Sequence, residues 1–292
     1  MIYLFGSIVL SSYLTLSFKM LERLGIPAFQ AIVFNYITCV ITGSLVMGKF
    51  PVSSTTSAEP WFWWAVVLGT FFITTFNIIA FTAQKIGVSV ASVSNKLSLV
   101  IPFLFSIYLY NEAATVWKII GIAIALGAVY LTCLPSKSED SSQKSIGKLV
   151  WFMPAILFLA SGLIDTMVKY VETSFLNETN QDAYLITSFG TAAVWGLLVL
   201  GTQLATGKAK LNKKAIIAGI AIGIPNYFSI WCLVHVLKHY SGNSSAIIPI
   251  NNMGIVLFST VMAWWIFKER LSKLNWMGIA LSLLAIAAIA YG

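Results

Sequence analysis

The chain has 292 residues, of which 58% are hydrophobic and only 10% are charged. Soluble domains carry roughly 25% charged residues, so this composition excludes a soluble globular protein. The net charge of +8 is spread over short segments between apolar runs, which is typical of a membrane protein and not of one that binds nucleic acid.

Ten apolar runs are each long enough for a transmembrane helix, which needs about 20 residues. The runs are continuous rather than alternating, which excludes a transmembrane β-barrel. Together they leave no room for a soluble domain. We therefore predict an all-α integral membrane protein whose ten spans cover roughly residues 2–18, 28–48, 61–83, 88–110, 115–134, 149–170, 183–206, 213–237, 244–267 and 273–291.

Polar residues interrupt the second and third predicted spans. The first span has no positive n-region before it, so we do not interpret it as a secretory signal. Asn35 and Tyr36 lie in the second span and are candidate substrate-binding residues. A cavity wall and hydrogen bonds between helices explain the polar stripe of the third span equally well; its members are Thr70, Thr74, Asn77 and Gln84.

Lys96 lies in the fourth predicted span, among Val, Leu, Ile and Phe. A span that begins near residue 88 places it about 12 Å into an apolar core of about 30 Å. A charge at that depth costs a few kcal/mol, which marks a candidate functional residue. We expect Lys96, with Asn95 beside it, to face a central cavity and bind an anionic group. The alternatives are snorkelling to the interface and pairing with a buried acid.

Asp165 is the only acid clearly inside a predicted span, the sixth. Intramembrane acids often carry protons, so Asp165 is a candidate for proton coupling or for binding a substrate amine. Lys169 follows one helical turn later, and an ion pair between the two side chains is the structural alternative.

The last spans contain further candidates for the wall of a cavity. In "GIAIGIPNYFSIW", Gly219 and Gly223 form a packing face, and Pro225 frees a backbone carbonyl next to Asn226. His235 and His239 are only two ligands and do not make a metal site alone. The candidate substrate-binding residues of these spans are Trp195, Asn226, Tyr227, Trp231, Asn251 and Asn252.

Neither the cysteines nor any short sequence motif indicates a metal site, a cofactor site or a catalytic site. Cys39, Cys133 and Cys232 are isolated inside spans, so they predict neither a disulfide framework nor a metal site. The sequence has no GxxxxGK[ST], dinucleotide fingerprint, HExxH or GxSxG. We therefore expect no cofactor, no metal and no enzymatic activity, and expect transport energy to come from a gradient or from exchange.

Two halves of five spans, 1–134 and 149–292, flank the polar stretch 135–148, which we interpret as a linker. "YNEAATVWKIIGIAIALGAVYL" at 110–131 aligns with "FKERLSKLNWMGIALSLLAIAA" at 267–288. An odd number of spans inserts the second half upside down relative to the first. Inverted repeats are a frequent plan of secondary transporters. The matched pairs are Glu112 with Glu269, Gly121 with Gly278, Asn95 with Asn252, Lys19 with Lys169 and Glu22 with Glu172.

The two halves resemble EamA-type repeats of the drug/metabolite transporter superfamily. The resembling element is a glutamate at the end of the fourth helix, followed about nine residues later by a glycine: "YNEAATVWKIIG" and "FKERLSKLNWMGIAL". The first copy departs from the pattern with "NEAA" where "KER"-like pairs are common. The resemblance implies ten helices around a central cavity and small polar metabolites, often exported, as substrates. Glu112 and Glu269 are then expected to anchor helix ends rather than to couple ions.

The leading functional hypothesis is a secondary transporter of small polar metabolites, such as amino acids, that works by alternating access and is expected to export them. The alternatives are a small-drug efflux antiporter and a membrane-embedded enzyme acting on lipid head groups. The expected partners are a small-molecule substrate and the lipid bilayer. One chain suffices for an internal repeat, so a monomer is expected to function, and a homodimer stays open.

The distribution of basic residues predicts how the chain lies in a cell membrane. Apart from Lys96, the loops after odd-numbered spans hold all of the lysines and arginines except Lys49, Lys118, Lys169 and Lys238. The positive-inside rule assigns the richer side to the cytoplasm, so both termini are predicted on the non-cytoplasmic side.

This orientation is tested with reporter fusions at each terminus. A reporter that is active only outside the cytoplasm should be active at both ends. Activity of a cytoplasm-specific reporter at either end would contradict the orientation.

Overall fold

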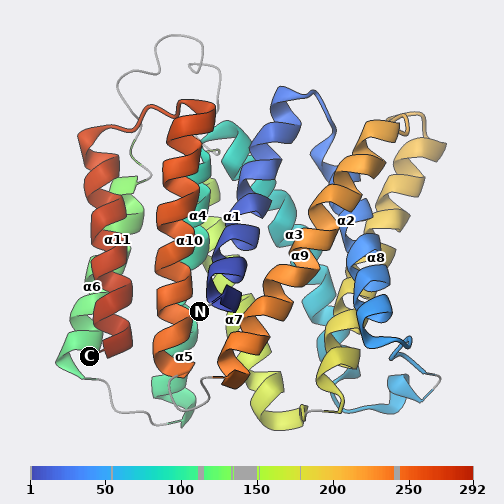
Figure 1. Ribbon diagram of the computed structural model, residues 1–292, viewed down its shortest axis with the longest axis horizontal. Coiled ribbons are helices and arrows are strands. Elements are labelled where there is room, and N and C mark those ends of the chain that lie inside the picture. Colours follow the sequence, from blue (N-terminus) through green and yellow to red (C-terminus); the bar gives the residue numbers. More distant parts are fainter. Residues whose placement is uncertain are drawn as a thin grey trace. The chain divides into compact units, whose positions relative to one another are not determined.

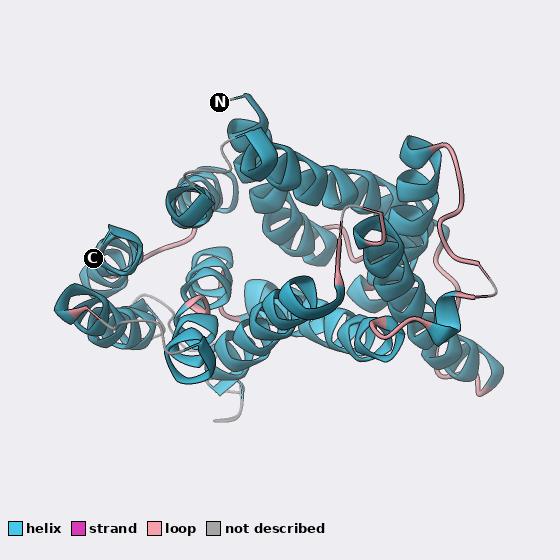
Figure 2. Cartoon of the chain, turned by 90° about the horizontal axis from the view of Figure 1, so that it is seen from below, coloured by secondary structure: helices cyan, strands magenta, loops and turns pink. Residues whose placement is uncertain are grey.

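The computed structural model describes residues 2–53, 55–110, 115–132, 134, 150, 152–177, 179–239 and 244–291. Figure 2 shows helices joined by loops, and the described residues contain no β-strand. Three sequence predictions concern positions outside these ranges, namely Glu112, Cys133 and the linker 135–148.

The described residues form eleven α-helices (Figure 1). Each predicted span contains one of them, except that the fourth contains two. The helices are α1 (Ile2–Arg23), α2 (Ala28–Met47), α3 (Phe62–Lys85), α4 (Val88–Leu97), α5 (Val100–Tyr110), α6 (Val116–Thr132), α7 (Met153–Phe175), α8 (Gln181–Ala205), α9 (Lys213–His239), α10 (Ser244–Phe267) and α11 (Lys273–Tyr291).

Eight stretches are long and apolar enough to cross a membrane, with α4 and α5 counted together as Val88–Phe105. Two further apolar stretches, Ile119–Thr132 in α6 and Lys273–Ile289 in α11, are shorter. The protein is therefore a multi-pass membrane protein. Several helices extend past the predicted apolar runs, because a helix does not have to end where it leaves the bilayer.

The fourth predicted span, 88–110, consists of two helices, which corrects the prediction of one continuous helix. Helix α4 ends at Leu97, and α5 begins at Val100. Pro102 has no N–H to donate to the carbonyl of Ser98, which accepts a bond from the Ile101 N–H at 2.9 Å instead. The Ser98 hydroxyl donates to the carbonyl of Asn95. Proline and serine together therefore close α4 with a tight turn.

The chain forms two compact units that do not coincide with its sequence halves. Unit 1 comprises Met1–Lys19, Ile78–Leu163 and Ser229–Gly292, and unit 2 comprises Met20–Asn77 and Ile164–Phe228. Each unit draws on both halves of the sequence. Helices α1, α3, α7 and α9 each contribute residues to both units.

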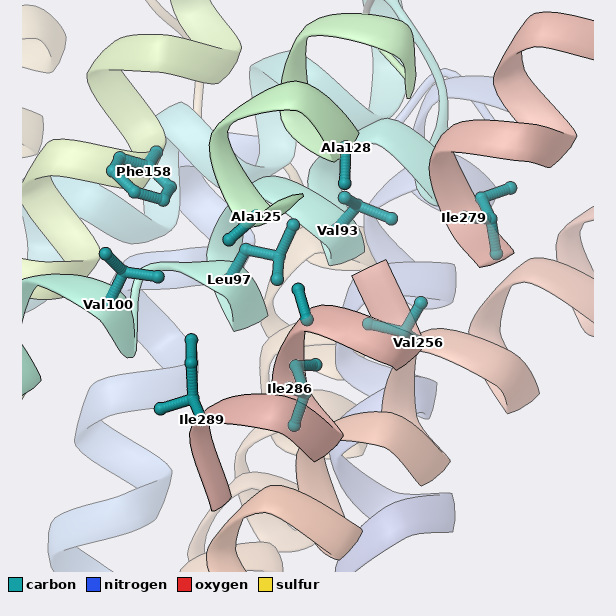
Figure 3. Close-up of a cluster of buried hydrophobic side chains, with 11 residues drawn as sticks. Val93, Leu97, Val100, Ala125, Ala128, Phe158, Val256, Ile279, Ile286 and Ile289 are labelled. Atoms are coloured by element: carbon teal, nitrogen blue, oxygen red, sulfur yellow. The ribbon is translucent and has the colours of Figure 1, made fainter. Parts of the chain in front are cut away.

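In unit 1, α6 packs along α11, and α4 packs against α10 (Figure 1). Figure 3 shows the apolar core of this unit, to which α4, α5, α6, α7, α10 and α11 contribute. Val93 and Leu97 project from one side of α4 into this core and are fully buried. That face of α4 is therefore used for packing.

Glycines bring α6 and α11 into close contact at two places. A Cβ added at Gly278 would lie 2.7 Å from the Thr132 backbone nitrogen and 2.9 Å from the Ala128 carbonyl oxygen. A Cβ added at Gly121 would lie 2.8 Å from a side-chain carbon of Ile289 and 3.2 Å from the Ala285 carbonyl oxygen. The two helix backbones approach as closely as small residues permit.

In unit 2, α2 packs along α8, and glycines of these helices face side chains rather than the opposing backbone. A Cβ at Gly43 of α2 would lie 3.1 Å from the Ile186 side chain, and one at Gly196 of α8 would lie 2.7 Å from that of Val33. The buried aromatic side chains of Tyr36 and Phe189 meet between these helices, with ring centroids 6.1 Å apart.

We predict opposite effects from two Gly→Ala substitutions in these helices. Both gain up to about 1 kcal/mol of helix propensity. Gly278→Ala also forces a methyl group against the backbone of α6, and overpacking of this kind costs about 1–3 kcal/mol. Gly278→Ala should therefore lower the thermal unfolding midpoint in detergent.

Gly127→Ala in α6 is the matched control, because its added Cβ would meet nothing within 4 Å. It should leave the midpoint unchanged or raise it. Equal midpoints for the two variants would contradict the close approach of α6 and α11.

Candidate functional site

Helix α4 presents polar residues on the side opposite its apolar face. At helical spacing, Ser92, Asn95 and Lys96 lie away from Val93 and Leu97. Ser92 is 1% exposed, and Asn95 and Lys96 are half-buried. The Ser92 hydroxyl is buried without a hydrogen-bond partner among the described residues. The packing around Ser92 therefore leaves its hydroxyl unsatisfied among the described residues.

Lys96 occupies the last turn of α4, directly before the break. The carbonyl groups at a helix C-terminus carry partial negative charge, which favours a cation there by about 0.3–1 kcal/mol. The carbonyl groups at the end of α4 thus favour the positive charge of Lys96. The break also frees backbone groups inside an apolar span, which is tolerated where they are buried in protein or line a cavity.

Helix α10, which packs against α4, carries the paired asparagines. Asn251 is 3% exposed, and its side-chain oxygen Oδ1 has no partner among the described residues. Asn252 is half-buried. Leaving a buried polar group unsatisfied costs about 1–3 kcal/mol, so such groups usually bind ordered water or a ligand. The structure thus brings the predicted residues of the fourth and ninth spans onto adjacent helices.

The carboxylate of Glu269 fixes the N-terminus of α4. It accepts hydrogen bonds from the backbone N–H of Val88 at 2.6 Å, and from the N–H and hydroxyl of Ser89 at 3.3 and 2.9 Å. The first N–H groups of a helix lack partners within the helix, and a carboxylate there also compensates the helix dipole. A residue from the loop after α10 therefore holds the helix that carries Lys96.

Unit 2 contains a separate buried polar cluster. The Asn226 side chain of α9 donates to the Asn35 oxygen of α2 at 3.1 Å. The thiol of Cys39 lies 3.8 Å from the same oxygen and 3.4 Å from the carbonyl of Gly223. The Asn35 side-chain nitrogen has no partner among the described residues. The predicted residues Asn35 and Asn226 therefore contact each other, and the Asn35 side-chain N–H groups have no acceptor among the described residues.

Two predicted aromatic residues are also buried in unit 2. Tyr36 is 1% exposed and Tyr227 is 6% exposed. The Tyr36 ring contacts Phe72, Phe76 and Phe189, with centroid distances of 5.4 to 6.5 Å. Its hydroxyl has no partner among the described residues. Buried tyrosine hydroxyls usually find one, so this group is also available to a ligand.

Other candidates lie in different surroundings. Asn77 donates to the carbonyl of Ile73 in its own helix at 2.7 Å. The Trp231 ring lies 3.7 Å from the His235 ring between centroids, with the two planes tilted by 33°. Asp165 is exposed on α7. Trp195 is 46% exposed and lines a surface hollow of about 410 Å³ in unit 2, together with Thr191 of the same helix.

Sequence reasoning missed the serines of α4. Ser92 and Ser94 are both buried, with hydroxyls that lack partners among the described residues. Serine is common in transmembrane helices and usually bonds to the backbone one turn earlier, so its presence alone carries no signal. The density of serine in "VSVASVSN" is the one feature that pointed to a polar helix.

Comparison with known proteins supports the fold over the whole chain. No protein-family model matches the chain. An uncharacterized protein of Haemophilus influenzae (strain Rd) is 28% identical over 293 residues, which cover 98% of this chain and 96% of that protein. A solved structure described as the crystal structure of a protein has a TM-score of 0.59 at 17% identity, over 99% of this chain and 95% of that one. The chain therefore has a full-length homologue and shares its helical membrane fold with a solved structure.

The Glu269 contact generates a prediction about stability. Glutamine offers one acceptor oxygen and turns an NH₂ group toward the N–H donors of α4, so Glu269→Gln should destabilise the protein by about 1–3 kcal/mol. The thermal unfolding midpoint in detergent measures this. Glu59→Gln, at an exposed site, removes the same charge and should have little effect. A midpoint for Glu269→Gln equal to that of the control would contradict a stabilising role.

Proposed function

We propose that the protein is a secondary transporter of small polar metabolites, built from two inverted five-helix repeats of the EamA type in the drug/metabolite transporter superfamily. The proposal rests on matched contacts between the two halves, on the break in the fourth span, and on the sequence resemblance. The full-length homologue and the shared fold are compatible with it and name no activity.

The observation that carries the proposal is the reciprocity of the glycine contacts between α6 and α11. Gly121 meets Ala285 and Ile289, and Gly278 meets Ala128 and Thr132. Gly278 follows Gly121 by 157 positions. The same offset relates Ala285 to Ala128 and Ile289 to Thr132. If two repeats are related by a two-fold axis, every contact must recur with the roles exchanged, which is the pattern here.

Unit 2 has the same reciprocity. Gly43 meets Ile186, and Gly196 meets Val33. Gly196 follows Gly43 by 153 positions, and Ile186 follows Val33 by the same number. Contacts of α3 and α9 follow a similar relation, with Gly223 lying 154 rather than 153 positions after Gly69. Gly69 meets Ser188 and Thr191 of α8, and Gly223 meets the equivalent residues of α2, which are Asn35 and Thr38.

Inverted repeats favour transport over the alternatives. Two halves inserted in opposite directions can exchange conformations, which opens a central site first to one side of the membrane and then to the other. A membrane enzyme acting on lipid head groups has no need of this plan. The absence of nucleotide-binding motifs from the sequence favours a gradient or solute exchange as the energy source.

The polar side of α4 is the proposed centre of substrate binding. Transporters of this plan bind substrate where helices are discontinuous, and α4 ends at Leu97, one residue after Lys96. In this proposal Lys96 binds an anionic group such as a carboxylate, and Asn95, Asn251 and Asn252 contact the polar remainder. Asp165 is the proposed proton carrier.

The proposal is tested by counterflow in proteoliposomes with a panel of amino acids, sugars and nucleosides. We expect exchange of a solute that carries a carboxylate. Lys96→Met removes one charge-assisted contact of about 1.5–3 kcal/mol, so it should raise the half-saturation concentration roughly 10- to 100-fold. Lys208→Met, at an exposed loop position, is the control and should behave as the native protein.

Each outcome of this experiment bears on a different part of the proposal. Failure of the native protein to exchange any solute of the panel would contradict metabolite transport. Exchange that is equally efficient in the native protein and in Lys96→Met would remove Lys96 from the site. Transport of cations that is lost in Asp165→Asn would favour the small-drug antiporter.

A further inference from the structure

A surface hollow of about 550 Å³ lies at the C-terminal end of α10 in unit 1. Three tryptophans and two basic residues line it together with the loop that leads into α11. Its lining residues are Trp264, Trp265, Lys268, Glu269, Arg270, Leu271 and Trp276. The hollow is separate from the residues assigned above to substrate.

The loop that borders the hollow is fixed at both of its ends. Glu269 turns inward and accepts the three hydrogen bonds from α4. Ser272 and Asn275 cap α11: the Asn275 oxygen accepts from the Ser272 N–H at 2.9 Å. The Asn275 side-chain nitrogen donates to three carbonyl groups at the end of α6, of which that of Leu134 is nearest at 2.8 Å. The loop is therefore held in place before any ligand binds.

Fixing Glu269 inward leaves its two neighbours facing outward. Lys268 and Arg270 are exposed, and Lys268 has a left-handed backbone with φ of 55° that turns the chain out of α10. Neither basic side chain has an ion pair within the described part of the chain, and the carboxylate between them is engaged with α4. The hollow therefore carries two positive charges that form no ion pair among the described residues, and the Glu269 carboxylate that also lines it is hydrogen-bonded to α4.

The tryptophans place this charge at the boundary of the membrane. Trp264 and Trp265 are 57% and 70% exposed and lie in the last turn of the candidate span Ile248–Phe267. Trp276 is 43% exposed in the first turn of α11. Exposed tryptophans are enriched at the level of lipid head groups. An occupant of the hollow thus meets aromatic surface beside two cations.

We propose that this hollow binds the head group of an anionic phospholipid, with Lys268 and Arg270 on the phosphate and the tryptophans against the glycerol and upper acyl chains. Charge complementarity selects an anionic lipid, and the guanidinium of Arg270 suits bidentate contact with phosphate oxygens. The inference rests on the membrane-spanning fold and is independent of what the protein transports.

Native mass spectrometry of the delipidated full-length protein tests the proposal. Phosphatidylglycerol and phosphatidylcholine with the same acyl chains are titrated in parallel. The native protein should bind phosphatidylglycerol more tightly. A juxtamembrane cation contributes about 1 kcal/mol, so the double variant Lys268→Gln, Arg270→Gln should weaken phosphatidylglycerol binding roughly 10- to 30-fold and leave phosphatidylcholine binding unchanged.

The matched control removes the same charge elsewhere. Lys213 and Lys214 are exposed at the start of α9, lie on the same predicted side of the membrane, and do not line the hollow. Their double substitution to Gln should preserve the preference for phosphatidylglycerol. Trp265→Leu should weaken binding of both lipids, because it removes aromatic surface and no charge.

Three results would overturn the proposal. One is equal binding of the two lipids by the native protein. Another is an undiminished preference for phosphatidylglycerol in the Lys268, Arg270 double variant when its thermal midpoint is native. The third is displacement of phosphatidylglycerol by an equal concentration of inorganic phosphate, which would assign the hollow to a free anion.

Discussion

In a bilayer the lipid tails are as apolar as leucine, so helices associate through close packing and not through the hydrophobic effect. The pairing of α6 with α11 meets this constraint at Gly121 and Gly278, where a methyl group would strike the opposing backbone. The pairing of α2 with α8 meets it at Gly43 and Gly196. These contacts join helices from the two sequence halves within each unit.

The polar character of α4 becomes possible because this framework buries the helix on its other side. Val93 and Leu97 contribute to the core, whereas Ser92 is buried without a hydrogen-bond partner among the described residues and Lys96 is half-buried. The break after Lys96 adds partial negative charge from the end of α4. A cation inside an apolar span is costly in isolation, and the local arrangement reduces that cost.

The loop after α10 combines two roles through the alternation of its side chains. Glu269 faces inward and stabilises the start of α4. Lys268 and Arg270 consequently face outward, beside tryptophans at the end of a membrane span. One short segment thus connects the helix that carries the proposed substrate site with the proposed lipid site at the membrane surface. A substitution of Glu269 is therefore expected to affect both the proposed substrate site and the proposed lipid site.

The sequence by itself determined the helical membrane class and the approximate positions of the spans, because runs of about 20 apolar residues have few other solutions. It also singled out Asn35 and Asn226, which do form a hydrogen bond. Only the tertiary structure decided that the fourth span breaks after Leu97, that Trp195 lines a hollow of unit 2, and that Glu269 reaches α4. These features depend on which residues of distant helices become neighbours, and hydropathy and local spacing carry no information about such contacts.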